Sequence, residues 1–332
     1  MNKVPKGVVL QLTKQCNYKC NHCSQSSFCV SNHLEIKELT TEEWFSALDR
    51  IKLTGCDRVL FSGGEVFLRT DIRKICEYAK KIGFEIAFVT NGTLIEQNID
   101  WISVLNPLSI RLSIYSIYQN KYEEITNIVN SYQNALKALQ ILGKKNLNTI
   151  IYFVLTNDNY CEISDLVKIV SSFGIYNYRF LQLTQLGRAK NLNKDFISLE
   201  HFMKFWQNLK ELKSSNELLN FKLTVNTLLL DFLKEQTNLS EFNFNCNLGI
   251  ETNWFINYKG EVFTCCILAN ESNLKIFNII ENDFENWHSW RHDKVFNLFN
   301  SKNEYNACYI PKLKVNNDRL NLPCQLTYIN VL

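Results

Sequence analysis

Residues 8–23 read VVLQLTKQCNYKCNHC, and this stretch decides how the rest of the chain is interpreted. Its first five residues, VVLQL, are apolar enough to predict a buried strand. The three cysteines Cys16, Cys20 and Cys23 follow this strand within eight positions. Parallel α/β folds keep their active residues at the carboxyl ends of strands, so these thiols occupy the place expected of a functional site.

Strand and helix patterns alternate outward from this stretch through the first two-thirds of the chain. Strands are predicted at 8–12, 58–62, 84–90, 108–116, 148–156 and 177–184, and helices at 40–55, 70–83, 95–104, 130–143 and 161–174. The first helix begins with a capping box, Thr40 and Glu43, and stops at Gly55. This alternation predicts a parallel sheet wrapped by helices. Helices at about 198–213 and 226–235 are predicted to form a bridge, and a hairpin over 254–266 to belong to a second, smaller domain.

Composition excludes several classes of protein. The chain has 332 residues, 46% hydrophobic and 21% charged, which is ordinary for globular proteins. Its 36 basic and 33 acidic residues give a net charge of +3, so nothing favours a nucleic-acid or membrane partner. No apolar run of membrane-spanning length and no signal peptide is found, so we expect a cytoplasmic protein. Its 12 cysteines then indicate metal binding, catalysis or burial rather than disulfides.

Thiolates are the preferred ligands of iron–sulfur clusters and good ligands of zinc. Three close cysteines without a fourth imply a metal with one open coordination position. Cys29 is the alternative fourth ligand, and it would make the site a closed zinc or structural site. The isolated Cys56 and Cys76 lie in apolar periodic segments, which predicts that they are buried core residues.

Two further motifs follow predicted strands. FSGGEVFL (61–68) carries Gly63, Gly64 and Glu65 after the second strand, and TNG (90–92) carries Asn91 after the third. The simpler interpretation of the first motif is a glycine turn. The functional one is that glycines let the backbone approach a ligand closely, while the carboxylate pairs with an amino group.

The C-x3-C-x2-C spacing, together with GGE, TNG, VLTNDN (154–159) and LGRAK (186–190), resembles the radical SAM superfamily over residues 7–190. The resemblance implies a partial (β/α)6 TIM-like barrel, with the radical SAM core at 1–197 and the helical bridge at 198–239. It implies that Cys16, Cys20 and Cys23 hold a [4Fe–4S] cluster whose open iron is chelated by S-adenosylmethionine (SAM). It also implies reductive cleavage of SAM to a 5′-deoxyadenosyl radical, which abstracts a hydrogen atom from the substrate.

The same resemblance implies a set of residues that contact SAM. The carboxylate of SAM is expected at Arg188 and its adenine near Leu186 and His22, although His22 facing solvent and Arg188 in a surface role are the alternatives. The whole set is His22, Gly63, Gly64, Glu65, Asn91, Ser113, Leu186 and Arg188.

The last quarter of the chain holds a second group of cysteines. Cys246, Gly260 and Cys265 form a C-x13-G-x4-C pattern that resembles the start of SPASM/twitch domains. This implies a cysteine-rich α+β domain over 240–332 with an auxiliary [4Fe–4S] cluster. The C-x2-C-x5-C-x3-C run of a full SPASM domain is missing, which favours one auxiliary cluster over two. A zinc site or free core thiols are the alternatives. The expected ligands are Cys246, Cys265, Cys308 and Cys324.

Cys266 directly follows an expected ligand, and neighbouring residues of an extended segment point in different directions. It is therefore a buried spare, a replacement for Cys265, or a catalytic residue. The last option draws on the G-E-x-x-x-C-C arrangement, which resembles that of radical SAM peptide epimerases. In those enzymes the second cysteine returns a hydrogen atom to a Cα radical.

SPASM/twitch enzymes mostly modify ribosomal peptides. The resemblance therefore implies a precursor peptide as substrate, epimerisation or crosslinking as outcome, and flavodoxin or ferredoxin as electron donor. One alternative is a radical SAM dehydrogenase of a small molecule, such as an amino sugar or a cofactor precursor. The other is a non-catalytic protein that binds zinc at both ends.

Overall fold

The structure is a computed structural model. It describes residues 7–27, 37–184, 186–192, 197–225, 253–263, 266, 269, 275–281, 314–315, 318–319 and 327–331. The chain divides into two compact units. The first is drawn from Met1–Lys19, Gln25–Arg111 and Asn247–Lys302, and the second from Cys20–Ser24, Leu112–Cys246 and Asn303–Leu332. The loop of three cysteines therefore contributes residues to both units.

The first unit is built around three parallel strands. They pair in the order β1 (Gly7–Thr13), β2 (Arg58–Gly63) and β3 (Glu85–Thr90). In β1 the side chains from Leu10 to Thr13 are all buried, as expected of a parallel strand covered on both faces. The parallel order brings the carboxyl ends of these strands to one edge, and the cysteine, GGE and TNG motifs follow those ends.

A short antiparallel segment extends this sheet on the other side of β1. β8 (Asn253–Ile256) pairs in parallel with β1, β9 (Glu261–Phe263) turns back against β8, and β10 (Phe277–Asn278) pairs with β9. The hairpin predicted over 254–266 therefore exists as β8 and β9. It joins the sheet of the first unit.

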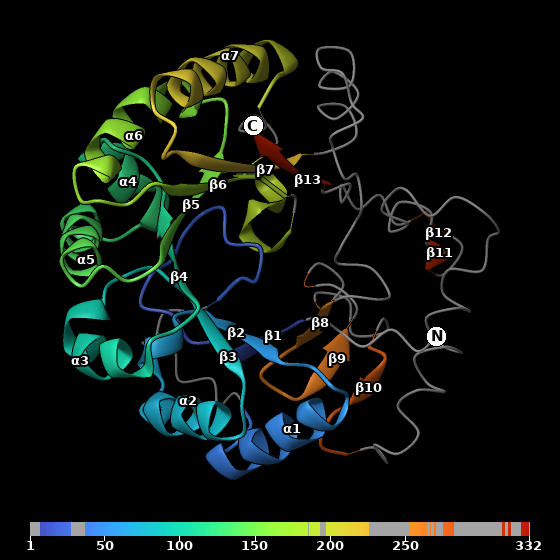
Figure 1. Ribbon diagram of the computed structural model, residues 1–332. Coiled ribbons are helices and arrows are strands. Elements are labelled where there is room, and N and C mark those ends of the chain that lie inside the picture. The colour runs from blue at the N-terminus through green and yellow to red at the C-terminus, as the bar shows by residue number, and fades with distance from the viewer. Residues whose placement is uncertain are drawn as a thin grey trace. The chain divides into compact units, whose positions relative to one another are not determined.

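Three helices cover the outer face of these strands (Figure 1): α1 (Thr41–Leu53), α2 (Ile72–Lys81) and α3 (Ile95–Leu105). The predicted capping box of α1 is confirmed, because the Thr40 side chain accepts from the backbone N–H of Glu43 while the Glu43 carboxylate accepts from the N–H of Thr40. Cys56 and Cys76 are 1% and 0% exposed, which confirms them as core residues.

The second unit has the parallel order β5 (Thr149–Leu155), β6 (Asn177–Gln182) and β7 (Asn220–Val225), with β13 (Thr327–Val331) antiparallel to β7. Its core is aromatic, with Phe180 packed against the rings of Phe153, Phe205 and Phe221. Four helices lie outside these strands (Figure 1): α4 (Gln119–Thr126), α5 (Ser131–Lys144), α6 (Ile163–Ser171) and α7 (Leu199–Ser215).

The remaining elements are short or lie at the boundary between units. β4 (Ser109–Ile114) crosses that boundary, between Arg111 and Leu112. The others are the 3-10 turns η1 (Val66–Leu68), η2 (Tyr160–Glu162) and η3 (Gly187–Asn191), and the paired strands β11 (Lys314–Val315) and β12 (Asp318–Arg319).

The α/β class with parallel strands is confirmed. α4 and β7 were not predicted from the sequence, and the helix predicted at 226–235 lies outside the described residues. The compact units also divide the chain differently from the domains expected at 1–197, 198–239 and 240–332, because residues from both ends of the chain enter each unit. Those domain boundaries stay a prediction.

Candidate cofactor site

Cys16 lies where the loop after β1 meets the GGE loop after β2, within the first unit. The N–H of Gly64 donates to the carbonyl of Thr13 at 2.9 Å, and the N–H of Glu65 donates to the carbonyl of Gln15 at 2.8 Å. A Cβ on Gly64 would stand 2.1 Å from that Gln15 oxygen and 2.9 Å from the Cβ of Cys16. Only glycine allows this approach, so Gly64 fixes the position of the cysteine loop.

Gly63, the last residue of β2, makes a similar approach, because a Cβ there would lie 2.7 Å from the carbonyl oxygen of Thr13. Both glycines of the motif therefore serve close packing of the two loops. This is a requirement of the fold, and it comes in addition to any contact that they make with a cofactor.

The Glu65 carboxylate connects the GGE loop to the TNG loop. It is completely buried and accepts from the hydroxyl of Thr90 at 2.8 Å, the N–H of Asn91 at 2.8 Å and the N–H of Phe67 at 3.2 Å. Burial raises the pKa of Glu65 to about 7, against the lowering effect of these three donors. The predicted bond between Glu65 and the amino group of SAM stays a prediction, since the carboxylate already accepts three bonds inside the protein.

Like Glu65, Asn91 is buried and hydrogen-bonded to other groups of the protein. Its side chain is 5% exposed, donates to Asn17 at 2.8 Å, and accepts from the hydroxyl of Thr93 at 2.6 Å. Because Asn17 directly follows Cys16, Asn91 is linked to the cysteine loop. Its predicted contact with SAM stays a prediction.

Cys20 and Cys23 lie in the second unit, where η3 braces them. The N–H of Arg188 donates to the carbonyl of Cys23 at 3.0 Å, and its guanidinium Nε donates to the carbonyl of Cys20 at 2.7 Å. Gly187 has φ +57°, and a Cβ there would lie 2.4 Å from the Cys23 oxygen, so a larger residue is excluded. Arg188 therefore positions the cysteine loop through these hydrogen bonds. Its predicted contact with the SAM carboxylate stays a prediction.

Burial controls ionisation in this part of the loop. It raises the pKa of the Cys20 thiol to about 12, and the neighbouring Cys23 adds to this effect. Burial also lowers the pKa of His22 to about 4, with a further lowering by the cation of Arg188. The His22 ring lies 4.8 Å from the Tyr115 ring, so His22 is neutral and packs on an aromatic neighbour rather than facing solvent alone.

Two of the predicted SAM contacts remain in the second unit. Ser113 is half-buried in β4, and its carbonyl accepts from the hydroxyl of Tyr122 at 3.4 Å. Leu186 is 2% exposed at the start of η3. Their positions follow the carboxyl-end placement expected from the sequence, and their roles stay predictions.

Cys266 lies beside Gln25 in the first unit. Its carbonyl accepts from the side chain of Gln25 at 3.4 Å, and the amide oxygen of Gln25 accepts from Gln11 at the same distance. The bonds are long and so individually weak. They nevertheless place the backbone of Cys266, a half-buried cysteine that forms no disulfide, beside Gln25, two positions beyond Cys23 in the sequence. The other C-terminal cysteines, Cys246, Cys265, Cys308 and Cys324, lie outside the described residues, as does Cys29.

The donor set fits an iron–sulfur cluster in its chemistry. Cys16, Cys20 and Cys23 are not in disulfides, and neither are the other cysteines that the structure describes. The backbone N–H of Tyr18 points at the sulfur of Cys16, 3.4 Å away, which is the kind of hydrogen bond that cluster sulfurs accept.

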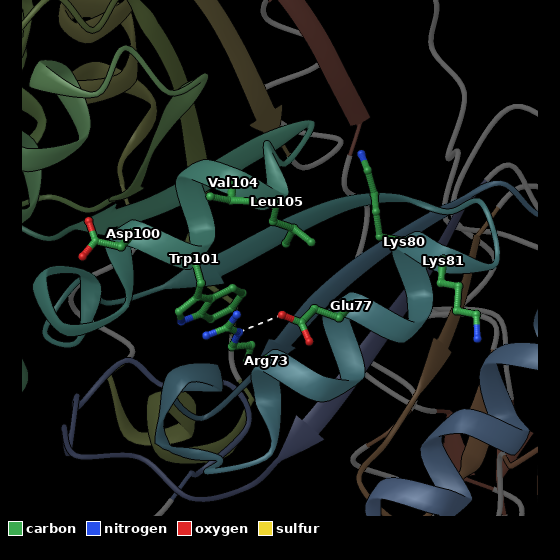
Figure 2. A pocket seen from close by; sticks show the side chains of 8 residues that line it. All are labelled: Arg73, Glu77, Lys80, Lys81, Asp100, Trp101, Val104 and Leu105. Atoms are coloured by element: carbon green, nitrogen blue, oxygen red, sulfur yellow. Dashed lines mark hydrogen bonds and ion pairs between the residues drawn. The ribbon is translucent and has the colours of Figure 1, made fainter.

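A separate cavity of about 530 Å³ lies between α2 and α3 (Figure 2). Trp101, Val104 and Leu105 form its apolar part, and Arg73, which lies beside Trp101 in Figure 2, pairs with Glu77 at 2.7 Å. None of the predicted site residues lines it. The predicted site residues that the structure describes lie at the carboxyl ends of the strands and in the loops that follow them, away from this cavity.

Sequence reasoning missed several residues that shape the loops. Asn17 and Thr93 complete the network around Asn91, and Gly187 gives the space that η3 needs. Glu162 is a buried carboxylate of the second unit that accepts from Ser116 at 2.7 Å and from Lys121 at 2.7 Å. Two of these residues could have been suspected from the sequence, because Asn17 directly follows Cys16 and Gly187 directly precedes Arg188.

Comparison with known proteins agrees with this geometry. Residues 10–170 match the family described as the radical SAM superfamily. The AdoMet-dependent heme synthase of Oleidesulfovibrio alaskensis is 22% identical over 314 residues, which cover 90% of this chain and 78% of that protein. The sporulation killing factor maturation protein SkfB of Bacillus subtilis is 23% identical over 198 residues, 58% of this chain and 47% of that protein.

Among solved structures, Streptococcus suis SuiB bound to its precursor peptide SuiA aligns with a TM-score of 0.72 at 18% identity. The alignment covers 86% of this chain and 65% of that one, so this chain spans less than two-thirds of SuiB and about half of SkfB. A likeness at this identity concerns the fold, and it confirms the predicted partial-barrel architecture.

Residues 10–170 are a radical SAM domain. Such a domain implies a [4Fe–4S] cluster and SAM as cofactors. No helix within the described part of the chain is both long and apolar enough to span a membrane.

Proposed function

We propose that the chain reductively cleaves SAM and abstracts a hydrogen atom from a residue of a ribosomally made precursor peptide, which gives epimerisation or a crosslink. The observation that carries this proposal is the loop of three cysteines after β1, none of them in a disulfide, in which Gly64 packs closely against Cys16 and Arg188 donates to the carbonyl of Cys20. The bound cofactors would supply the organic radical. The chain itself holds, orients and shields them.

In this proposal Cys16, Cys20 and Cys23 hold the cluster. The raised pKa of Cys20 means that its thiol is protonated near neutral pH without metal, so iron binding must displace a proton. His22 stays neutral and packs beside Tyr115. The remaining proposed SAM contacts are Gly63, Gly64, Glu65, Asn91, Ser113, Leu186 and Arg188.

The direct test is an anaerobic incubation with SAM, dithionite and the peptide encoded by any short open reading frame found beside the gene. We expect 5′-deoxyadenosine from the wild type and none from Cys20→Ala. With a peptide deuterated at Cα, deuterium should appear in that product. Absence of SAM cleavage by reconstituted wild type would contradict the proposal and favour the zinc-binding alternative.

An auxiliary cluster held by Cys246, Cys265, Cys308 and Cys324 is part of the proposal on the strength of the sequence pattern. Iron analysis of a Cys16→Ala/Cys20→Ala/Cys23→Ala variant tests it. About four irons per chain, one cubane, are expected to remain after anaerobic reconstitution. A chain without iron, or with zinc, would make this a single-cluster enzyme.

Cys266 is proposed as the hydrogen-atom donor of an epimerisation. Its thiol would give a hydrogen atom to the Cα radical of the peptide, and the thiyl radical left behind would be restored by one electron and one proton from the donor system. Its place beside Gln25 supports this role. Cys266→Ala should still form 5′-deoxyadenosine but no epimerised peptide, and unchanged epimerisation would rule out this role.

The likeness to SuiB and SkfB supports a peptide substrate, and flavodoxin or ferredoxin is the proposed donor. The likeness to a heme synthase supports the alternative of a small-molecule substrate, such as a cofactor precursor. Turnover of a small molecule, with no product from any peptide, would favour that alternative.

A further inference from the structure

A closed ring of side-chain hydrogen bonds connects the cysteine loop to the TNG loop. Asn91 Nδ2 donates to Asn17 Oδ1 at 2.8 Å, Asn17 Nδ2 donates to Thr93 Oγ1 at 2.8 Å, and Thr93 Oγ1 donates to Asn91 Oδ1 at 2.6 Å. Each side chain donates once and accepts once around the ring, so the orientations of both amides are consistent with one another.

The ring is anchored on the side of the TNG loop. The N–H of Thr93 also donates to Asn91 Oδ1 at 3.0 Å, and the N–H of Asn91 donates to the buried carboxylate of Glu65. Asn91 is 5% exposed and Glu65 is completely buried. The TNG side of the ring is therefore fixed by the core, and Asn17 is the member that reaches across to the cysteine loop.

Asn17 stands between Cys16 and Tyr18, and the N–H of Tyr18 donates to the Cys16 sulfur at 3.4 Å. A rotation of the backbone at Asn17 would turn that N–H away from the sulfur. Gly64 packs against Cys16 from the GGE side, while the ring holds the next residue from the TNG side. The sulfur of Cys16 is thus oriented from two directions.

We propose that Asn17, Thr93 and Asn91 are positioning residues for the cluster, which hold Cys16 and its N–H···S bond in place. The inference rests on the proposed role of Cys16 as a cluster ligand. Hydrogen bonds to cluster sulfurs tune the reduction potential, and partners of metal ligands affect metal retention. An N–H donor stabilises the more negative, reduced cluster, so its loss shifts the midpoint potential to more negative values.

The test uses Asn17→Ala, which opens the ring at two bonds, and Thr93→Val, which removes the hydroxyl with little change in size. Thr93→Ser keeps the hydroxyl and is the rescue variant. Gln97→Ala changes an exposed side chain of α3 and is the matched control. Three quantities are measured on anaerobically reconstituted full chain: the rate of iron loss to a chelator, the midpoint potential, and the SAM-induced change in the EPR spectrum. Only a cluster with an open iron can bind SAM, so that change reports on the proposed cluster of the three-cysteine loop and not on any auxiliary cluster.

We expect Asn17→Ala and Thr93→Val to lose iron roughly ten-fold faster or more, in line with other partners of metal ligands. Their midpoint potential should become more negative and their SAM-induced EPR change should differ from that of wild type. Thr93→Ser and Gln97→Ala should match wild type. Wild-type potential, spectrum and iron retention in both ring variants would overturn the proposal.

Thermal unfolding of the cluster-free variants separates positioning from folding. A lowered melting temperature with an unchanged potential and spectrum in the remaining holoprotein would also overturn the proposal, because the ring would then only stabilise the fold. A Cys16→Ala variant distinguishes failure of the proposal about the ring from failure of the cluster assignment on which that proposal rests. If that variant keeps the SAM-responsive spectrum, the proposed cluster assignment fails, whatever the ring variants show.

Discussion

At the scale of single residues, the space around Gly64 is the most restrictive feature of the site. Gly64→Ala would put a Cβ 2.1 Å from the carbonyl oxygen of Gln15, a backbone atom that cannot move without shifting Cys16. Overpacking of this kind costs about 1–3 kcal/mol of unfolding free energy. We expect this variant to fold less stably and to retain little iron on the three-cysteine loop.

Gly174→Ala is the matched control for Gly64→Ala. Gly174 has φ +77°, and no atom lies within 4 Å of the place where a Cβ would stand, so alanine there costs only about 1–2 kcal/mol of backbone strain. Urea unfolding of both variants, with iron analysis, compares the two effects. Equal iron content in both variants would show that close packing at Gly64 does not fix the cysteine loop.

Glu65 gives a prediction about pH. Burial raises its folded-state pKa from 4.5 to about 7, so the unfolded chain ionises this group before the folded chain does. The contribution of Glu65 to stability is therefore greatest below pH 4.5 and declines as the pH rises through about 7. Glu65→Gln removes the titration, so the stability difference between wild type and variant should fall across this window. Urea unfolding of cluster-free protein at several pH values measures it, and parallel pH profiles would contradict the raised pKa.

Residue roles were less predictable from the sequence than residue positions. Glu65 and Asn91 follow strands as predicted, yet their side-chain bonds go to Thr90 and Asn17. Asn17 and Asn91 are 74 positions apart. No periodicity links residues at that separation, and only the parallel pairing of β1, β2 and β3 brings them together.

At the scale of elements, the capping box of α1 is the clearest case in which local sequence decides structure. Thr40→Ala removes the side-chain acceptor for the N–H of Glu43 and should cost about 1 kcal/mol of unfolding free energy. Thr40→Ser keeps the hydroxyl and should cost much less. Chemical denaturation of the two variants measures the difference, and an equal loss in both would mean that the threonine methyl, not the cap, matters.

Elements with strong periodicity were predicted and weaker ones were not. α2 buries Ile72, Ile75, Cys76 and Ala79 at helical spacing, which is visible in the sequence. α4 is eight residues long with only Tyr122 and Thr126 buried, so its apolar pattern is too short to detect. β7 was missed because a short alternating run such as NFKLTV is also compatible with a loop at a helix end.

At the scale of the whole molecule, the hairpin of β8 and β9 shows how distant segments complete one structure. It was predicted as part of a separate domain because the composition changes near residue 240. In the structure β8 pairs with β1, the strand that leads into the cysteine loop, and the N–H of Leu39 donates to the carbonyl of Tyr258 at 2.9 Å. Composition cannot reveal such pairing, because it does not encode which strand edge is open.

The last prediction concerns stabilisation of the whole chain by its cofactors. If SAM binds to the open iron, it should stabilise the folded state only when the cluster is present. At a SAM concentration 100 times the dissociation constant this amounts to about 2.7 kcal/mol, which is several degrees in melting temperature. Anaerobic thermal unfolding with and without SAM should show the shift in the reconstituted wild type, and no shift in the Cys16→Ala/Cys20→Ala/Cys23→Ala variant. S-adenosylhomocysteine keeps the amino and carboxylate groups and should also shift the wild type, which separates chelation from cleavage. An equal shift by SAM in the cysteine variant would mean that the protein binds SAM through other residues, and the cluster would then not be its anchor.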